Sequence, residues 1–138
     1  MSYAFYIDRG RNHVTGVLDQ RILLEEWLTA VSQVPALRLA QGDLSVANPI
    51  TGELVTVMRN HGGDVEMEVD IGRVRKVWQR DWRRVLFWSP SGRIMFSPDA
   101  FVDRQLRTDL RIPQALARSL NAQIRGESGE LYVDEFLD

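Results

Sequence analysis

Acidic side chains occupy every second position of VEMEVDI, residues 65–71. In a β-strand this spacing puts Glu66, Glu68 and Asp70 on one face, with neighbouring Cα atoms about 7 Å apart. Carboxylates placed in this way can bind a hard cation if loops add further oxygen ligands, or serve as an acid–base pair. No D-x-[DN]-x-[DN]-G loop accompanies them, so neither a metal site nor a cofactor is expected. The pattern favours a strand face that meets water or a basic partner.

The end of the chain, RGESGELYVDEFLD at 125–138, contains five carboxylates and one arginine. Aromatic side chains among acids suit a protein interface, because aromatics anchor binding and complementary charge speeds association. A solvated terminus is the alternative interpretation. The candidate partner-binding residues here are Glu127, Glu130, Tyr132, Asp134, Glu135, Phe136 and Asp138, in addition to the three strand acids.

The usual catalytic groups are scarce. The chain has no cysteine, which removes thiol catalysis and zinc–thiolate sites. Its two histidines, His13 and His61, fall in expected turns, and neither accompanies a G-x-S-x-G motif. Phosphate-binding glycine motifs are absent as well. The sequence therefore assigns no catalytic residue, and we do not expect an enzyme.

A basic, tryptophan-containing stretch offers a different kind of chemistry. Residues 73–84 interleave arginine and lysine with Trp78 and Trp82, a composition typical of phosphate contacts and base stacking. The net charge of −2 and the acidic flanks oppose such binding. The favoured interpretation pairs these arginines with the acids of 66–70 and places Val77 and both tryptophans partly in the core. A nucleic-acid-binding adaptor is the alternative.

Charge is also segregated along the chain. Residues 1–72 carry five Arg and ten acids, residues 73–125 carry eleven Arg and one Lys against four Asp, and residues 126–138 carry five acids and no base. Such segregation indicates either oppositely charged surface patches or two faces that meet inside the fold.

These residues require a scaffold of hairpins and helices. The pattern predicts one α+β domain over 1–138, with antiparallel sheet, hairpins and two to three helices. No stretch is long and apolar enough for a membrane span, and no secretory signal is visible, so a soluble cytoplasmic protein is expected. The expected elements are strands at 3–7, 14–18, 54–58 and 65–71, a helix within 19–35, a hairpin at 85–96 turning at 89–92, a short helix from Ser97 to Arg104, a helix from Pro113 carrying Leu116, Leu120 and Ile124 on one face, and two short strands about 126–129.

The segments ILLEEWLTAV, LFWSPSGRIMF and ALARSLNAQIRGESGELY, after an aromatic first strand, resemble those of small bacterial α+β proteins. Among these are the immunity proteins that neutralise polymorphic toxins of the Rhs type. The resemblance implies a non-enzymatic inhibitor without catalytic residues. It implies a cognate toxin with a basic surface as the partner, bound so that its active site or substrate surface is covered.

Overall fold

The computed structural model describes residues 4–10, 20–105 and 107–131 of the chain. Strands dominate the described part, and two α-helices and one 3₁₀ turn accompany them. The elements in chain order are β1 (Phe5–Asp8), α1 (Leu24–Ser32), β2 (Leu37–Leu39), β3 (Leu44–Ala47), β4 (Leu54–Met58), β5 (Val65–Val74), β6 (Val77–Ser89), β7 (Arg93–Phe96), η1 (Pro98–Ala100), α2 (Arg111–Ser119) and β8 (Gln123–Gly126).

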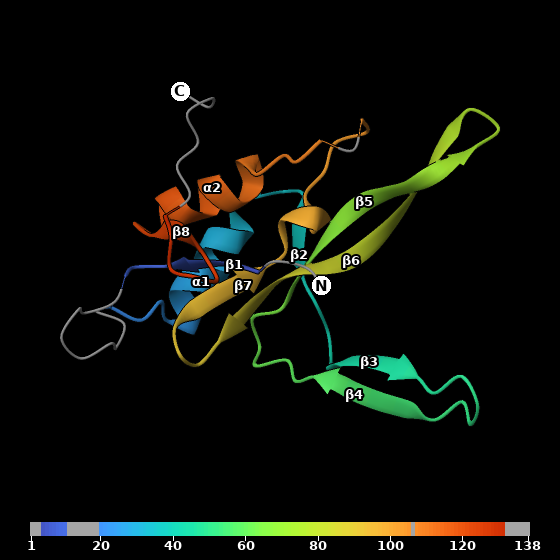
Figure 1. Ribbon diagram of the computed structural model, residues 1–138, viewed down its shortest axis with the longest axis horizontal. Coiled ribbons are helices and arrows are strands. Elements are labelled where there is room, and N and C mark those ends of the chain that lie inside the picture. Colours follow the sequence, from blue (N-terminus) through green and yellow to red (C-terminus); the bar gives the residue numbers. More distant parts are fainter. Residues whose placement is uncertain (1–3, 11–19, 106, 132–138) are drawn as a thin grey trace.

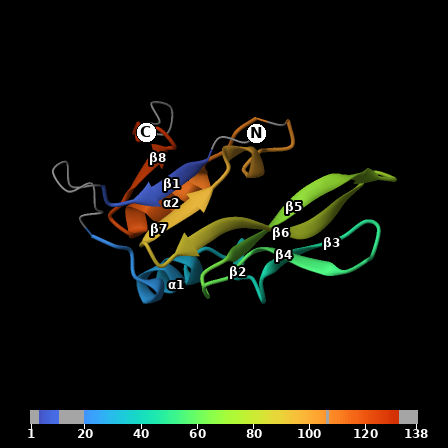
Figure 2. The ribbon, with the colours of Figure 1, turned by 60° about the horizontal axis from the view of Figure 1, so that its bottom comes forward.

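Six strands form one antiparallel sheet in the order β2-β5-β6-β7-β1-β8 (Figure 1). Strands β3 and β4 pair only with each other among the described residues and form a separate hairpin. Figure 2 shows this hairpin and the far part of β5 and β6 extending from the same side of the body, away from α2 and β8. The predicted α+β fold with antiparallel sheet is confirmed.

The core lies between the sheet and the two helices. Ile7 of β1 is paired with Ile94 of β7 and Ile124 of β8, so the three side chains point to one face. That face packs against Trp27 of α1 and Leu116 of α2 in a single hydrophobic cluster. Full burial of an aliphatic side chain contributes about 1.5–3 kcal/mol, so this cluster is the main source of stability.

Helix α1 confirms the helix expected within 19–35, and its first turn contains Glu25 and Glu26. A Glu26 oxygen accepts the Leu23 backbone N–H at 3.0 Å and thereby satisfies a donor at the helix start. The other carboxylate oxygen accepts from Arg9 at 2.7 Å. Because the Arg9 hydrogen bond favours the charged form, the pKa of Glu26 is lowered from its ordinary 4.5.

We expect Glu26→Gln to lower the melting temperature at pH 7 by about 3 °C, or roughly 1 kcal/mol, because one helix-start acceptor and the ion pair are weakened. A carboxyl whose folded pKa is depressed stabilises the fold above its unfolded pKa and loses that contribution as pH falls through the folded value. The difference between variant and wild type should therefore shrink below about pH 4.5 in melting curves followed by circular dichroism. A constant difference down to pH 2.5 would contradict this account.

Two predictions about the later helices are wrong in their bounds. The short helix expected from Ser97 to Arg104 is only the 3₁₀ turn η1, since Phe101 is drawn into the core right after it. Helix α2 begins at Arg111, two positions before Pro113, where Asp109 accepts the Arg111 backbone N–H at 3.2 Å.

Helix α2 also ends sooner than the apolar spacing suggests. Asn121 adopts a positive φ of 53°, and Ala122 N–H bonds back to the Ala117 carbonyl at 2.8 Å. This is the hydrogen bond of a Schellman stop. Leu120 thus caps the helix, and Ile124 reaches the core from β8.

Most of the strand predictions are confirmed. The hairpin expected over 85–96 is confirmed as β6 and β7, joined by a turn in which Gly92 N–H bonds to the Ser89 carbonyl at 2.8 Å. The strands expected at 54–58 and 65–71 are present as β4 and within β5. The strand expected at 14–18 lies outside the described residues.

Candidate binding surfaces

A buried carboxylate organises the sheet face that α1 and α2 leave uncovered. Asp8, at the end of β1, accepts a hydrogen bond from Arg125 at 2.8 Å and from the Gly10 backbone N–H at 3.0 Å, and pairs with Arg93 at 3.5 Å. Arg93 in turn stacks over the Tyr6 ring at 3.6 Å. Asp8 is 0% exposed because these side chains cover it. The arginines are therefore held in place by the fold, which is a structural role.

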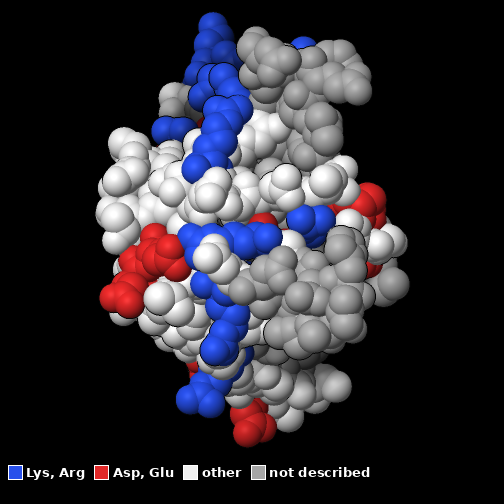
Figure 3. Space-filling view, turned by 90° about the vertical axis from the view of Figure 1, so that its left-hand side faces the viewer, with Lys and Arg blue, Asp and Glu red and all other residues white. Residues whose placement is uncertain are grey.

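More cations gather beside this cluster. Arg9 donates to the Leu120 carbonyl at 2.9 Å and to the Arg21 carbonyl at 3.3 Å, so it joins the end of β1 to the end of α2 and to the segment before α1. Figure 3 shows lysine and arginine side chains in a broken band down this side of the molecule, with acids mainly at its margins. This face has the opposite sign to the surface that the sequence predicts for a basic partner.

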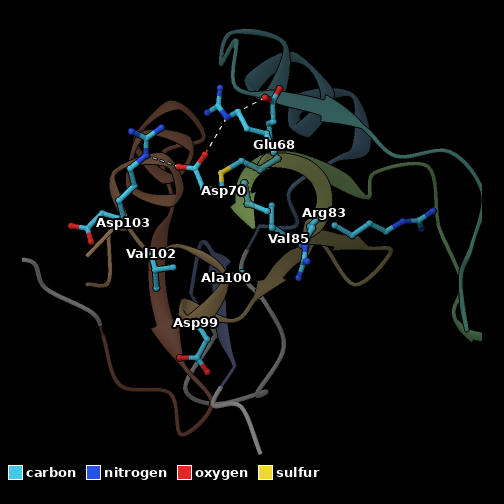
Figure 4. Close-up of a pocket in the computed structure, with 13 residues that line it drawn as sticks. Glu68, Asp70, Arg83, Val85, Asp99, Ala100, Val102 and Asp103 are labelled. Atoms are coloured by element: carbon cyan, nitrogen blue, oxygen red, sulfur yellow. Dashed lines mark hydrogen bonds and ion pairs between the residues drawn. The ribbon is translucent and has the colours of Figure 1, made fainter. Parts of the chain in front are cut away.

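A hollow of about 490 Å³ lies on the other side of the body, between the β5–β6 pair and the segment from η1 to residue 104 (Figure 4). Its lining combines five apolar side chains with four acids and four arginines. The lining residues are Met67, Glu68, Val69, Asp70, Arg80, Arg83, Arg84, Val85, Asp99, Ala100, Val102, Asp103 and Arg104.

Two of the predicted site acids lie in this hollow and face cations of the same chain. Arg80 contacts Glu68 at 3.2 Å and Asp70 at 3.3 Å, and Arg104 donates to Asp70 at 2.9 Å. The Arg104 hydrogen bond lowers the pKa of Asp70, so this carboxylate is charged at neutral pH. Figure 4 shows Glu68 and Asp70 turned toward these arginines.

The third strand acid is paired in the same manner. Glu66 accepts a hydrogen bond from Arg38 of β2 at 2.9 Å, and the Arg38 guanidinium also lies 4.0 Å from the Trp82 ring. The structure therefore brings Glu66, Glu68 and Asp70 to one strand face, as predicted, but the surface they form is of mixed charge. The favoured interpretation drew the paired arginines from 73–84, and Arg80 does come from there, whereas Arg38 of β2 and Arg104 after η1 are additional partners.

The basic stretch 73–84 divides into two parts. Arg80 pairs with the β5 acids, as the favoured interpretation requires, whereas Arg84 pairs with Asp64 at 3.1 Å. Trp82 is half-buried, but Val77 is 60% exposed, so its expected place at the core is wrong. The side chain of Trp78 lies outside those described.

Sequence reasoning missed Asp64, which is almost completely buried between the β3–β4 hairpin and the sheet. Burial raises its pKa, and the hydrogen bond from Arg84 opposes that rise. Arg84 also donates to the Gln41 carbonyl at 2.7 Å, and Asn60 donates to the Ala40 and Gly42 carbonyls at 3.1 Å. These bonds fix the base of the β3–β4 hairpin. In the sequence Asp64 ends the turn-like stretch NHGGD at 60–64, so nothing there indicated that it forms a buried ion pair with Arg84.

The C-terminal candidates are described only as far as residue 131. Gly126 N–H bonds to the Glu130 carbonyl at 2.8 Å, and Arg125 forms an isolated bridge with Leu131, so the predicted turn about 126–129 is present. Glu127 is exposed and accepts the Ala4 backbone N–H at 2.6 Å, and Glu130 is exposed as well. Tyr132, Asp134, Glu135, Phe136 and Asp138 lie outside the described residues.

The β3–β4 hairpin carries an exposed apolar surface that the sequence analysis did not single out. Val46 is paired with Val55, and Val57 follows two positions along β4, so the three share one face. Their exposed fractions are 54%, 50% and 59%. We call these three residues the valine face. Leu54 on the opposite face is 73% exposed, and Ile50 in the connecting turn is 92% exposed.

The geometry thus defines an α+β protein with a single helix-covered sheet and two projecting hairpins. A scan against family models and searches of curated proteins and of solved structures found no match to the chain. Within residues 4–10, 20–105 and 107–131, no helix is long and apolar enough to cross a membrane. The same residues contain no group of three or more His, Asp or Glu side chains placed to hold a metal ion.

Proposed function

We propose that this chain is a binding protein that inhibits a partner protein, as an immunity protein does to its cognate antibacterial toxin. The observation that carries the proposal is the β3–β4 hairpin. It stands apart from the six-stranded sheet and exposes aliphatic side chains on both faces and at its turn. An exposed apolar patch on a projecting element is characteristic of a surface that another protein covers.

The distribution of apolar residues favours insertion into a groove. A flat contact would use one face of the hairpin, whereas Leu54 and Ile50 extend the apolar surface beyond the valine face to the opposite side and the turn. A hairpin that enters a groove buries both faces and its turn together, as needed to occlude an active-site cleft. Burial of this apolar area is then the main favourable contribution to binding.

Charge indicates that the groove belongs to a different protein. Glu53 is the only charged residue among positions 44–58, so the complementary groove should be mostly apolar with a cation opposite Glu53. The hollow of this chain is rimmed by eight charged side chains and does not match. The proposed partner is therefore a toxin domain with an apolar, partly basic cleft, and the proposed location of the complex is the cytoplasm.

The test uses the protein encoded by the gene beside that of this chain, co-expressed with wild type, Val55→Asp or Val77→Asp. Both valines are exposed strand residues, and only Val55 belongs to the hairpin. A carboxylate placed in an apolar groove should weaken binding by about 100-fold, since an unpaired charge is desolvated. We expect cells with Val55→Asp to lose protection and cells with Val77→Asp to grow like wild type.

Three outcomes would contradict the proposal. A neighbouring protein that is harmless to growth when expressed alone would mean that there is no toxin to inhibit. Equal protection by both variants removes the hairpin from the interface. A change in oligomeric state of the free chain in Val55→Asp, seen by light scattering, would assign the valine face to a second copy instead.

A further inference from the structure

The β5–β6 pair extends far beyond the sheet to which it belongs. Strand β2 pairs with β5 only over residues 65–67, and β7 pairs with β6 only over residues 87–89. Within the described part of the chain, no other strand pairs with the stretch between them. Residues 68–82 therefore form a two-stranded ribbon with both edges open, which projects from the body in Figure 1. We call it the β5–β6 ribbon.

The tip of this ribbon is basic, and no acid in the described part of the chain forms an ion pair with its cations. Arg73, Arg75 and Lys76 are exposed, and no ion pair joins any of them to another described residue. The acids of the ribbon, such as Asp70, lie nearer its base and face Arg80 and Arg104. The positive field of the tip is thus not neutralised by its own strand partners.

The turn at the tip holds its two cations in an unfavourable backbone conformation. Val74 is paired with Val77, so Arg75 and Lys76 form a two-residue hairpin turn. Their φ angles are 50° and 67°, in the left-handed region that such turns require. Asn-Gly is the usual choice here, because residues with larger side chains are strained at positive φ. Two cations at strained positions indicate that their charge is used.

We propose that the tip of the β5–β6 ribbon enters the major groove of duplex DNA, with Arg73, Arg75 and Lys76 on the phosphates of its two walls. A two-stranded ribbon fits that groove, which is about 12 Å wide. Phosphate contacts dominate affinity for DNA, so the binding is expected to depend little on sequence. The activity is independent of the β3–β4 hairpin and of the inhibitory function proposed for it.

The test measures fluorescence anisotropy of a labelled 20-base-pair DNA of mixed sequence at several salt concentrations. Three phosphate contacts predict a slope of log K against log salt of about −3 for the wild type. In the double variant Arg75→Asn/Lys76→Gly the slope should change from about −3 to about −1. Binding at low salt should be at least about tenfold weaker. Its melting temperature should rise by about 3 °C, because Asn-Gly relieves the strained turn.

Arg107→Asn/Arg111→Asn is the matched control, since it removes two cations that are paired with Asp103 at 2.9 Å and Asp109 at 2.7 Å. It should keep the DNA affinity within about twofold. Equal DNA binding by wild type and the tip variant would overturn the proposal, and so would a lower melting temperature of the tip variant. Arg73→Gln, which leaves the turn unchanged, should make the slope less negative by about 1.

Two competitors of the labelled DNA distinguish insertion into the major groove from binding to any polyanion. The major groove of duplex RNA is deep and narrow, so an RNA of the same length should compete at least about tenfold less well than the DNA. Poly-glutamate at equal charge concentration should compete poorly too. If the RNA matches the DNA, groove insertion is wrong. If poly-glutamate matches it, the tip binds acidic protein surfaces instead.

Discussion

Trp27→Ala should lower the free energy of unfolding by about 3–5 kcal/mol, which corresponds to a fall in melting temperature of about 10 °C or more. Trp27 is 0% exposed at the centre of the cluster between α1 and the sheet. Its indole N–H also donates to the Gly63 carbonyl at 2.8 Å, and this carbonyl would lose its partner. Guanidinium denaturation followed by circular dichroism measures the change.

Trp82→Ala is the matched control, because it removes the same side chain from the β5–β6 ribbon. Trp82 is half-buried and contacts Arg38 outside the hydrophobic core. Loss of this contact should change the free energy of unfolding by about 1 kcal/mol or less. Equal destabilisation by the two variants would mean that the ribbon is part of the folding core and not a projection from it.

Asp8→Ala should destabilise the fold by about 3 kcal/mol. The carboxylate is buried beneath Arg93 and Arg125, and its removal leaves two guanidinium groups facing each other without their shared counter-charge. Both arginines are 21% exposed, so water can compensate for part of the loss. We therefore expect a destabilisation at the low end of the range that is typical when one partner of a buried ion pair is removed.

Asp109→Ala provides the comparison, since Asp109 pairs with the exposed Arg111 at 2.7 Å. A pair on the surface contributes little, and we expect a change within about 1 kcal/mol. Thermal melts of both variants at pH 7 give the measurement. An Asp8→Ala protein as stable as the Asp109→Ala protein would show that the cluster about β1 contributes nothing to stability.

Local signals explain which elements were predictable. The 85–96 hairpin combines two apolar runs with Ser89 and Gly92 at the turn, and both signals lie within a few residues of each other. The alternation of 65–71 likewise predicted that Glu66, Glu68 and Asp70 share one face. Helix ends were less predictable, because Asn121 and Asp109 act through backbone geometry that the apolar spacing does not reveal.

Contacts between distant segments explain what was missed. Asp8 and Arg125 are separated by 117 positions, and Arg84 and Gln41 by 43, so no local pattern joins them. The same reason hid two partners of the strand acids, since Arg38 and Arg104 approach Glu66 and Asp70 from other elements. The valine face was missed because alternating valines are as typical of a strand with one buried face as of an exposed hairpin.

The central claim is that the β3–β4 hairpin is the part of this protein that its partner covers. Hydrogen exchange of the chain, alone and with the neighbouring gene's product, tests it most directly. We predict slower exchange in the complex over residues 44–58, with little change in α1 or α2. Protection confined to residues 126–138, with 44–58 exchanging as in the free chain, would contradict the claim and assign the interface to the acidic C-terminal segment.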